Sequence, residues 1–273
     1  QTELTKGDSF AAARQRAVAA LLSPSDAALL SDPNNTLGIE YCRALLRVGA
    51  APALFTIPRT GAAHDAAPEN AGGYSASAIR HLLAEGRPAN ALSRMVPAMR
   101  AVYEAEESAG RAPVFAAACE RAILARLRSM TPAEFDALDT GHEGVGQRLY
   151  NASRNAATLD AVLDNAKTKR YAYARLRRMV LWAYLGLTPA KLPASVPYLR
   201  VLAANEIGRA LLGRMRKTAR LPVITKPAAI RSLFPDAQRL FETESRATDL
   251  YALAYPELTE ACGSLWRQNP VMP

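Results

Sequence analysis

The sequence contains few cysteines and histidines. Its 273 residues include three of each, and the cysteines lie far apart at Cys42, Cys119 and Cys262. An odd number of isolated thiols excludes a disulfide framework and a CxxC redox or metal motif. The histidines show neither an HExxH motif nor Cys/His ligand spacing, so we expect no structural metal site. We interpret the three cysteines as small core residues.

Long apolar runs are absent as well. No stretch of the sequence approaches the roughly 18 consecutive apolar residues that a membrane-spanning helix needs. The opening residues 1–6 lack the charged-then-apolar order of a secretory signal. The chain is 49% hydrophobic and 22% charged, which is typical of a globular protein rather than a disordered one. These features predict a soluble, cytoplasmic protein without a membrane partner.

The sequence does have an excess of positive charge. Its 34 Lys and Arg residues against 25 Asp and Glu residues give a formal net charge of +9. Such an excess indicates an anionic partner, and nucleic acids and phosphorylated ligands are the main classes.

Apolar residues recur at helical spacing along most of the chain, and alanine and leucine, which favour helices, are abundant. The best strand candidate is the run 52–57, which Pro58 closes. We expect a loop at 32–35, a helix that begins at Ser75, and short extended pieces at 198–203 and 221–224. The other expected helices are 9–22, 36–48, 94–108, 113–129, 131–138, 145–154, 158–166, 170–186, 205–220 and 235–254. We therefore predict a mainly α protein in which a remnant of an α/β domain, residues 1–88, precedes a larger helical domain, residues 89–273.

Three segments of the first part are candidates for phosphate binding. Asn34 and Asn35 stand at a helix start, where backbone N–H groups lack partners and the helix dipole is positive. The run Ser75-Ala76-Ser77-Ala78-Ile79-Arg80 places two hydroxyls at another helix start and a guanidinium one turn later, and Arg59 follows the strand candidate. Amides, hydroxyls and guanidinium groups together satisfy the distributed charge of a polyphosphate. The alternative is that these residues are helix caps, turn residues and solvated surface charges.

Two later helices combine an apolar face with a basic one. The apolar residues expected to face inward are Tyr173, Leu176, Met179, Val180, Ala183, Tyr184 and Leu187 in the first, and Ile207, Leu211, Leu212 and Met215 in the second. The cations expected to contact a nucleic-acid backbone are Lys169, Arg170, Arg175, Arg177, Arg178, Arg209, Arg216 and Lys217. Tyr171, Tyr173 and Trp182 are candidates for stacking on an unpaired base. The alternative is that the arginines are solvated and that the aromatic residues belong to the core.

These segments resemble the tRNA(Met) cytidine acetate ligase family, a branch of the HIGH-motif nucleotidyltransferase superfamily. The resemblance is carried by the loop and helix at 33–41 (PNNTLGIEY), the run 59–65 (RTGAAHD) and the run 75–80 (SASAIR), in the order and spacing of the family. It continues through 169–178 (KRYAYARLRR), 198–202 (YLRVL), 205–209 (NEIGR) and 221–226 (LPVITK), and so covers most of the chain.

The resemblance implies an enzyme that activates acetate with ATP and Mg²⁺ as acetyl-adenylate and acetylates N4 of the wobble cytidine of elongator tRNA(Met). It identifies residues 1–88 as the C-terminal part of a Rossmann-like nucleotidyltransferase domain and residues 89–273 as a basic, tRNA-binding domain. By family likeness, Asn34, Arg59, Ser75, Ser77 and Arg80 correspond to ATP-binding positions.

The sequence departs from this family in one motif. The family's first strand and its HxGH-type motif are expected before residue 1, and no His-x-Gly-His occurs in the chain. That motif positions the nucleotide's phosphates and stabilises charge during adenylate formation. We therefore assign no catalytic residue and expect this chain alone to be an incomplete, inactive fragment. Two alternatives stay open: a non-catalytic RNA-binding helical module, and a small-molecule adenylyltransferase of the same superfamily.

Overall fold

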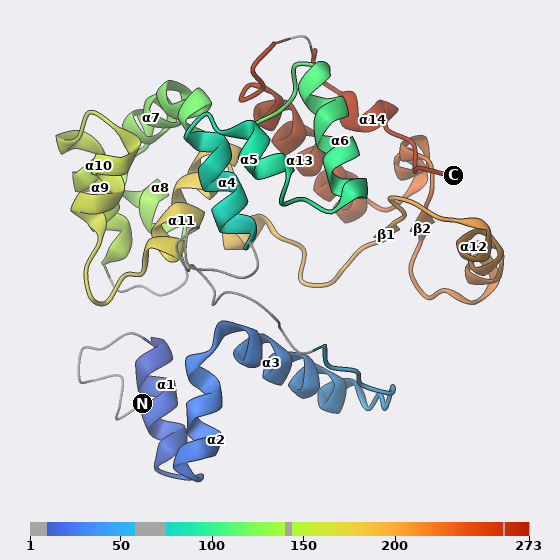
Figure 1. The fold of residues 1–273 in the computed structure, drawn as a ribbon, viewed down its shortest axis with the longest axis horizontal. Coiled ribbons are helices and arrows are strands. Elements are labelled where there is room, and N and C mark those ends of the chain that lie inside the picture. The colour runs from blue at the N-terminus through green and yellow to red at the C-terminus, as the bar shows by residue number, and fades with distance from the viewer. Residues whose placement is uncertain (1–9, 58–74, 140–143, 259, 273) are drawn as a thin grey trace.

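The computed structural model describes residues 10–57, 75–139, 144–258 and 260–272, and the described chain is mainly helical (Figure 1). Its α-helices are α1 (Phe10–Ala19), α2 (Pro24–Ala28), α3 (Pro33–Val48), α4 (Ala76–Ala84), α5 (Pro88–Leu92), α6 (Pro97–Ser108), α7 (Glu120–Ser129), α8 (Pro132–Asp136), α9 (Val145–Asn155), α10 (Leu159–Ala166), α11 (Tyr173–Leu185), α12 (Glu206–Thr218), α13 (Pro235–Ala252) and α14 (Ser264–Arg267). Short 3₁₀ turns are η2 (Leu29–Ser31), η4 (Ala116–Cys119), η5 (Pro189–Lys191) and η6 (Pro227–Ser232). The strands are β1 (Leu199–Arg200) and β2 (Val223–Ile224).

The helices predicted from apolar spacing are confirmed in position, with shifts of up to three residues at their ends, except that the helix expected at 113–129 begins only at Glu120, after the 3₁₀ turn η4. The expected loop at 32–35 is wrong, because Pro33 opens α3 and Asp32 is its cap. Proline suits the first turn of a helix, since that turn's N–H groups have no intrahelical partner. The short extended pieces are confirmed where β1 and β2 pair in parallel, with Leu199 opposite Val223.

The expected strand at 52–57 is not formed, and residues 51–57 have no regular secondary structure. A strand is stabilised by hydrogen bonds to a neighbour, and the only sheet in the described residues is the β1–β2 pair. The α/β character of residues 1–88 therefore stays a prediction, as does the division into two domains.

The largest core lies among α7–α11. Leu127, Phe135, Leu149, Val162 and Leu176 are fully buried there. The inward face predicted for α11 is confirmed, since Leu176, Met179, Val180 and Ala183 are all buried. Cys119 also belongs to this core, whereas Cys42 and Cys262 are exposed, so the prediction of three core cysteines is correct only for Cys119. Apolar spacing predicts which residues share a helix face, and an isolated cysteine gives no such pattern.

A second core holds the C-terminal part together. Ile224 of β2, Ile230 of η6, Phe241 of α13 and Leu265 of α14 meet in it. The Tyr198 hydroxyl donates to Glu244 Oε2 at 3.1 Å and so joins the start of β1 to α13. Burial, together with the nearby Glu244 carboxylate, raises the pKa of Tyr198, which keeps this phenol a donor.

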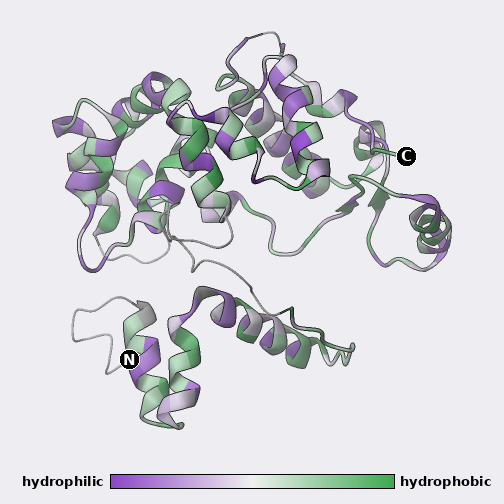
Figure 2. Cartoon of the chain, viewed as in Figure 1, coloured by the Kyte–Doolittle hydropathy of each residue, from purple (hydrophilic) through white to green (hydrophobic). Residues whose placement is uncertain are grey.

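The inward face predicted for α12 is wrong. Ile207 is 80% exposed and Leu211 is 52% exposed, and α12 has no buried residue. Hydrophobic and hydrophilic residues alternate along this helix, which stands at the edge of the molecule beside β1 and β2 (Figure 2). Amphipathic spacing fixes the two faces of a helix, but tertiary packing decides whether another element covers one of them.

The residues that precede α12 are tied to the end of the described chain. Ala203 and Val271 form a parallel bridge. The Ala204 N–H donates to the Val271 carbonyl oxygen at 3.0 Å, and the Val271 N–H donates to the Leu202 carbonyl oxygen at 3.0 Å.

At the other end of the chain, α1, α2, η2 and α3 pack chiefly on one another, and Figure 1 shows them apart from the remaining helices. Arg14 of α1 donates to Glu40 Oε1 of α3 at 2.9 Å. α4 and α5 pack together through Ile79, Leu82 and Ala91.

Candidate functional site

The N-terminus of α3 carries Asn34, the first predicted ATP-binding residue. Its backbone N–H donates to Asp32 Oδ1 at 2.7 Å, and the Asn35 N–H donates to the same oxygen at 3.4 Å. The Asp32 carboxylate therefore satisfies two of the free N–H groups and offsets the positive end of the helix dipole. The Asn34 residue itself is exposed.

The N-terminus of α4 carries Ser75, Ser77 and Arg80. Ser75 is the N-cap, and its Oγ accepts a hydrogen bond from the Ala78 N–H at 3.2 Å. Ser77 is half-buried and Arg80 is exposed. Because Ser77 and Arg80 are three residues apart, they lie on one face of the helix. A hydroxyl and a guanidinium group are therefore available on the same side of α4 near its N-terminus.

The structure brings together only part of the predicted ATP-binding set. Ser75, Ser77 and Arg80 share α4, whereas Asn34 is on α3, which lies apart from α4 in Figure 1. Arg59 falls outside the described residues. An ATP site that joins Asn34 to the α4 residues therefore stays a prediction.

The start of α11 gathers several of the predicted nucleic-acid contacts. Lys169 and Arg170 precede the helix, and Arg177 and Arg178 are exposed on its surface. Two cations lie near the half-buried ring of Tyr173: Lys167 Nζ is 5.2 Å from the ring centroid, and the guanidinium carbon of Arg177 is 5.4 Å from it. This end of α11 thus combines exposed positive charge with a fixed aromatic ring.

One predicted contact on α11 has a structural role instead. Arg175 Nη2 donates to Asp139 Oδ2 at 2.5 Å, and both side chains are largely buried. Its guanidinium also lies 5.6 Å from the ring centroid of Tyr171. Tyr171 is buried, so it does not offer a free face to a base, whereas Trp182 is half-buried against the main core.

The remaining predicted contacts lie on α12. Arg209 approaches Glu206 at 3.9 Å and is half exposed, and Arg216 and Lys217 are exposed in the last turn. Figure 1 shows α12 at the right edge, well apart from α11 in the left-hand group of helices, so the basic residues of the two helices form two separate surfaces. A polynucleotide is long enough to contact both surfaces, and a small anion is not.

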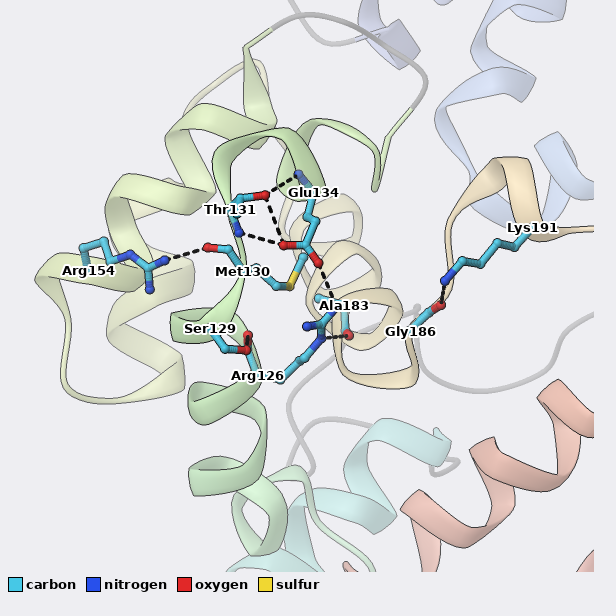
Figure 3. Close-up of polar contacts among 9 residues, drawn as sticks. All are labelled: Arg126, Ser129, Met130, Thr131, Glu134, Arg154, Ala183, Gly186 and Lys191. Carbon is cyan, nitrogen blue, oxygen red and sulfur yellow. Dashed lines mark hydrogen bonds and ion pairs between the residues drawn. The ribbon is translucent and has the colours of Figure 1, made fainter.

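Several other cations stabilise the C-termini of helices, and three of them are drawn in Figure 3. The sequence alone did not indicate this structural role. Arg154 of α9 donates to the carbonyl oxygens of Arg128 and Met130 at 2.6 and 2.7 Å, at the end of α7. Arg126 reaches the Ala183 carbonyl oxygen at 3.2 Å near the end of α11. Arg148 Nε donates to the Ala166 carbonyl oxygen at 2.8 Å, and Lys191 Nζ donates to the Gly186 carbonyl oxygen at 2.7 Å. The last carbonyls of a helix lack partners and carry negative charge, so cations stabilise them.

Neither a metal centre nor a membrane anchor is indicated by the described part of the chain. Its His, Cys, Asp and Glu side chains form no group of three or more suited to a metal ion. None of its helices is both long enough and apolar enough to span a bilayer.

Comparisons with known proteins identify the family and the fold of the chain. A family model described as HIGH Nucleotidyl Transferase matches residues 1–264. The chain is 32% identical to the tRNA(Met) cytidine acetate ligase of Acetivibrio thermocellus, over 99% of the chain and 68% of that relative. The apo crystal structure of Thermotoga maritima TmcAL superposes with a TM-score of 0.90 at 27% identity, covering 99% of this chain and 69% of that one.

A second crystal form of Thermotoga maritima TmcAL, described as bound with alpha-thio ATP, gives a TM-score of 0.88 at 27% identity, covering 99% of this chain and 68% of that one. The order of helices seen here is therefore that of a solved enzyme fold. The chain belongs to the HIGH nucleotidyltransferase family of enzymes, and its relatives in that family are tRNA(Met) cytidine acetate ligases.

Proposed function

We propose that the chain is part of an enzyme that acetylates N4 of the wobble cytidine of elongator tRNA(Met) with acetate and ATP. One observation carries this proposal: relatives named tRNA(Met) cytidine acetate ligase match the chain along almost its whole length. The basic surface at the start of α11 gives independent support, because it suits a polyanionic partner. The site of action is then the cytoplasm, where tRNA is available.

The reaction divides into two steps. In the first, an acetate oxygen attacks the α-phosphorus of ATP, acetyl-adenylate forms and pyrophosphate leaves. In the second, the cytidine N4 attacks the acetyl carbonyl carbon, AMP leaves and N4 loses a proton. Both steps need a nucleotide whose triphosphate charge is neutralised and whose position is fixed.

Within this proposal the predicted residues have distinct roles. Asn34, Arg59, Ser75, Ser77 and Arg80 bind ATP, whose triphosphate carries Mg²⁺. Exposed Arg80 supplies a fixed positive charge beside the Ser77 hydroxyl, which suits a phosphate oxygen. We assign no catalytic residue, because the sequence contains no His-x-Gly-His motif. For the same reason we propose that the chain alone does not form the adenylate.

The cations proposed to contact tRNA are Lys169, Arg170, Arg177, Arg178, Arg209, Arg216 and Lys217. Arg175 no longer belongs to this set, since it is paired with Asp139. Contacts to phosphates fix the position of the RNA and carry little sequence information. Recognition of the elongator tRNA must therefore come from contacts to bases or from the shape of the RNA.

The test is mass spectrometry of tRNA nucleosides after the complete protein has been incubated with ATP, isotope-labelled acetate and tRNA. We expect labelled N4-acetylcytidine that depends on ATP. Without ATP the label should be absent. Bound tRNA without labelled cytidine would contradict the enzymatic proposal.

A second candidate is a non-catalytic RNA-binding module. It is favoured by one observation, that Asp32 and Ser75 already cap the two helices proposed to bind ATP. This candidate predicts salt-dependent tRNA binding with no acetylation, and the nucleoside experiment separates it from the first.

A further inference from the structure

A groove runs along α13, and none of the residues predicted to bind ATP or tRNA lines it. A hollow of about 860 Å³ lies between α13 and the segment 190–194. A second hollow of about 270 Å³ lies between α13, η6 and Trp266. Gln238 and Glu242 line both hollows, so the two lie next to each other along α13, and we refer to them together as the α13 groove.

The larger hollow is lined by three cations, Lys191, Arg239 and Arg246. Arg239 is paired with Asp236, and Lys191 donates to the Gly186 carbonyl oxygen. The Arg246 side chain is exposed and has no hydrogen bond or ion pair to any residue that the structure describes. Arg246 is therefore the cation in this hollow that is most accessible to an anion.

The smaller hollow contains a rigid stacking surface. Trp266 packs edge-on against the buried Phe241, with ring centroids 4.5 Å apart. The guanidinium carbon of Arg231 lies 5.3 Å from the centroid of the Trp266 ring. Unpaired bases stack on aromatic rings and on guanidinium planes, so this pair suits a base.

Glu242 lies where the two hollows meet, and it is exposed. An ionised carboxylate only accepts hydrogen bonds, and it repels phosphate. It accepts well from an exocyclic amino group such as N4 of cytosine. The groove thus has an anion-binding end, a hydrogen-bond acceptor in the middle and a stacking surface at the other end.

We propose that the α13 groove binds an unpaired nucleotide of the RNA, with its phosphate at Arg246 and its base on the Arg231–Trp266 pair. Glu242 accepts a hydrogen bond from the base's amino group and therefore favours cytosine over uracil. The inference rests on the proposed function for its choice of RNA as the partner. It adds base recognition to surfaces that otherwise contact only phosphates.

The test uses tryptophan fluorescence of the whole chain during titration with short oligocytidylate or oligouridylate. The sequence has two tryptophans, and Trp266→Phe removes the one in the groove while keeping an aromatic ring against Phe241. We expect oligocytidylate to quench the wild-type fluorescence and to leave that of Trp266→Phe unchanged. Arg246→Ala should weaken binding of both oligonucleotides by about tenfold, the loss expected for one charged hydrogen bond. Glu242→Gln should reduce the preference for cytosine.

The matched control is Arg267→Ala, an exposed arginine next to Trp266 that does not line the groove. It should bind the oligonucleotides as the wild type does, whereas an equal loss in Arg246→Ala and Arg267→Ala would overturn the inference. Wild-type protein that shows no quenching but still binds tRNA through α11 would overturn the inference and leave the proposed function standing. Wild-type protein whose fluorescence is quenched by oligocytidylate but that does not bind tRNA would contradict the proposed function and leave nucleotide binding in the α13 groove standing.

Discussion

Arg154 on α9 donates to the Met130 carbonyl oxygen at 2.7 Å, just after the last turn of α7. The same side chain also donates to the Arg128 carbonyl oxygen at 2.6 Å and lies 4.5 Å from the centroid of the Tyr150 ring. One guanidinium group therefore connects two helices of the main core. Part of the positive charge of the chain serves to hold the fold and not to bind a partner.

We expect Arg154→Ala to lower the free energy of unfolding by about 1–2 kcal/mol, because charged hydrogen bonds to the end of α7 are lost. Arg178→Ala, at an exposed position on α11, is the control and should change it by less than about 0.5 kcal/mol. Urea unfolding followed by circular dichroism measures both. Equal stabilities for the two variants would contradict the role given to Arg154.

Arg175 and Arg177, two residues apart on α11, should behave differently. Arg175→Ala breaks the pair with Asp139, so we expect a loss of about 1–3 kcal/mol in stability. Arg177→Ala should leave stability nearly unchanged and weaken tRNA binding at low salt. It should also reduce the slope of log K against log salt by about 0.9, the loss of one phosphate contact. A salt-independent affinity for tRNA would contradict phosphate binding by α11.

Glu134 should make the protein sensitive to acid. Hydrogen bonds from the Thr131 backbone and side chain, with the charge of Arg126, hold the pKa of this carboxyl below its usual 4.5. A lowered pKa in the folded state means that the ionised group stabilises the fold above pH 4.5. This stabilisation disappears as the pH falls through the lower, folded-state pKa.

Unfolding experiments between pH 3 and pH 7 should therefore show stability that declines on the acid side. Glu134→Gln should have a flatter profile and lower stability at neutral pH. An unchanged profile in this variant would show that other carboxylates, such as Glu106 beside Arg111, are responsible.

Substitutions on the exposed face of α12 should have little effect on the stability of the chain. Ile207→Ser should change the free energy of unfolding by less than about 0.5 kcal/mol, because Ile207 is 80% exposed. Leu176→Ala, at a fully buried position of α11, should cost about 2–5 kcal/mol. A large loss for Ile207→Ser in the isolated chain would mean that α12 packs against another surface in solution.

The sequence predicted the features that depend on residues close together along the chain, namely helix positions and helix caps. Helical spacing located α11 and its buried residues, and the hydroxyl of Ser75 indicated the start of α4. The same spacing failed to show that Ile207 is exposed, since no element among the described residues buries the apolar face of α12. The run 52–57 has the composition of a strand, but a strand also needs a partner that local sequence does not specify.

In the candidate site too, the sequence could not predict contacts between residues that lie far apart along the chain. Arg175 and Arg177 are indistinguishable in the sequence, because Asp139, which binds Arg175, precedes it by 36 residues. The arginines that bind the C-terminal carbonyl oxygens of helices could not be recognised either, since those carbonyl partners lie on other helices. The groove along α13 depends on Trp266 and on the segment 190–194, which only the folded chain brings together.

The bridge between Ala203 and Val271 has a practical consequence. The residues that lead into the basic helix α12 are hydrogen-bonded to the backbone of Val271. Val271→Pro removes the N–H that donates to the Leu202 carbonyl oxygen, and it is therefore expected to alter the orientation of that helix. A weaker affinity of this variant for RNA would then reflect a displaced helix and not a lost contact at Val271 itself.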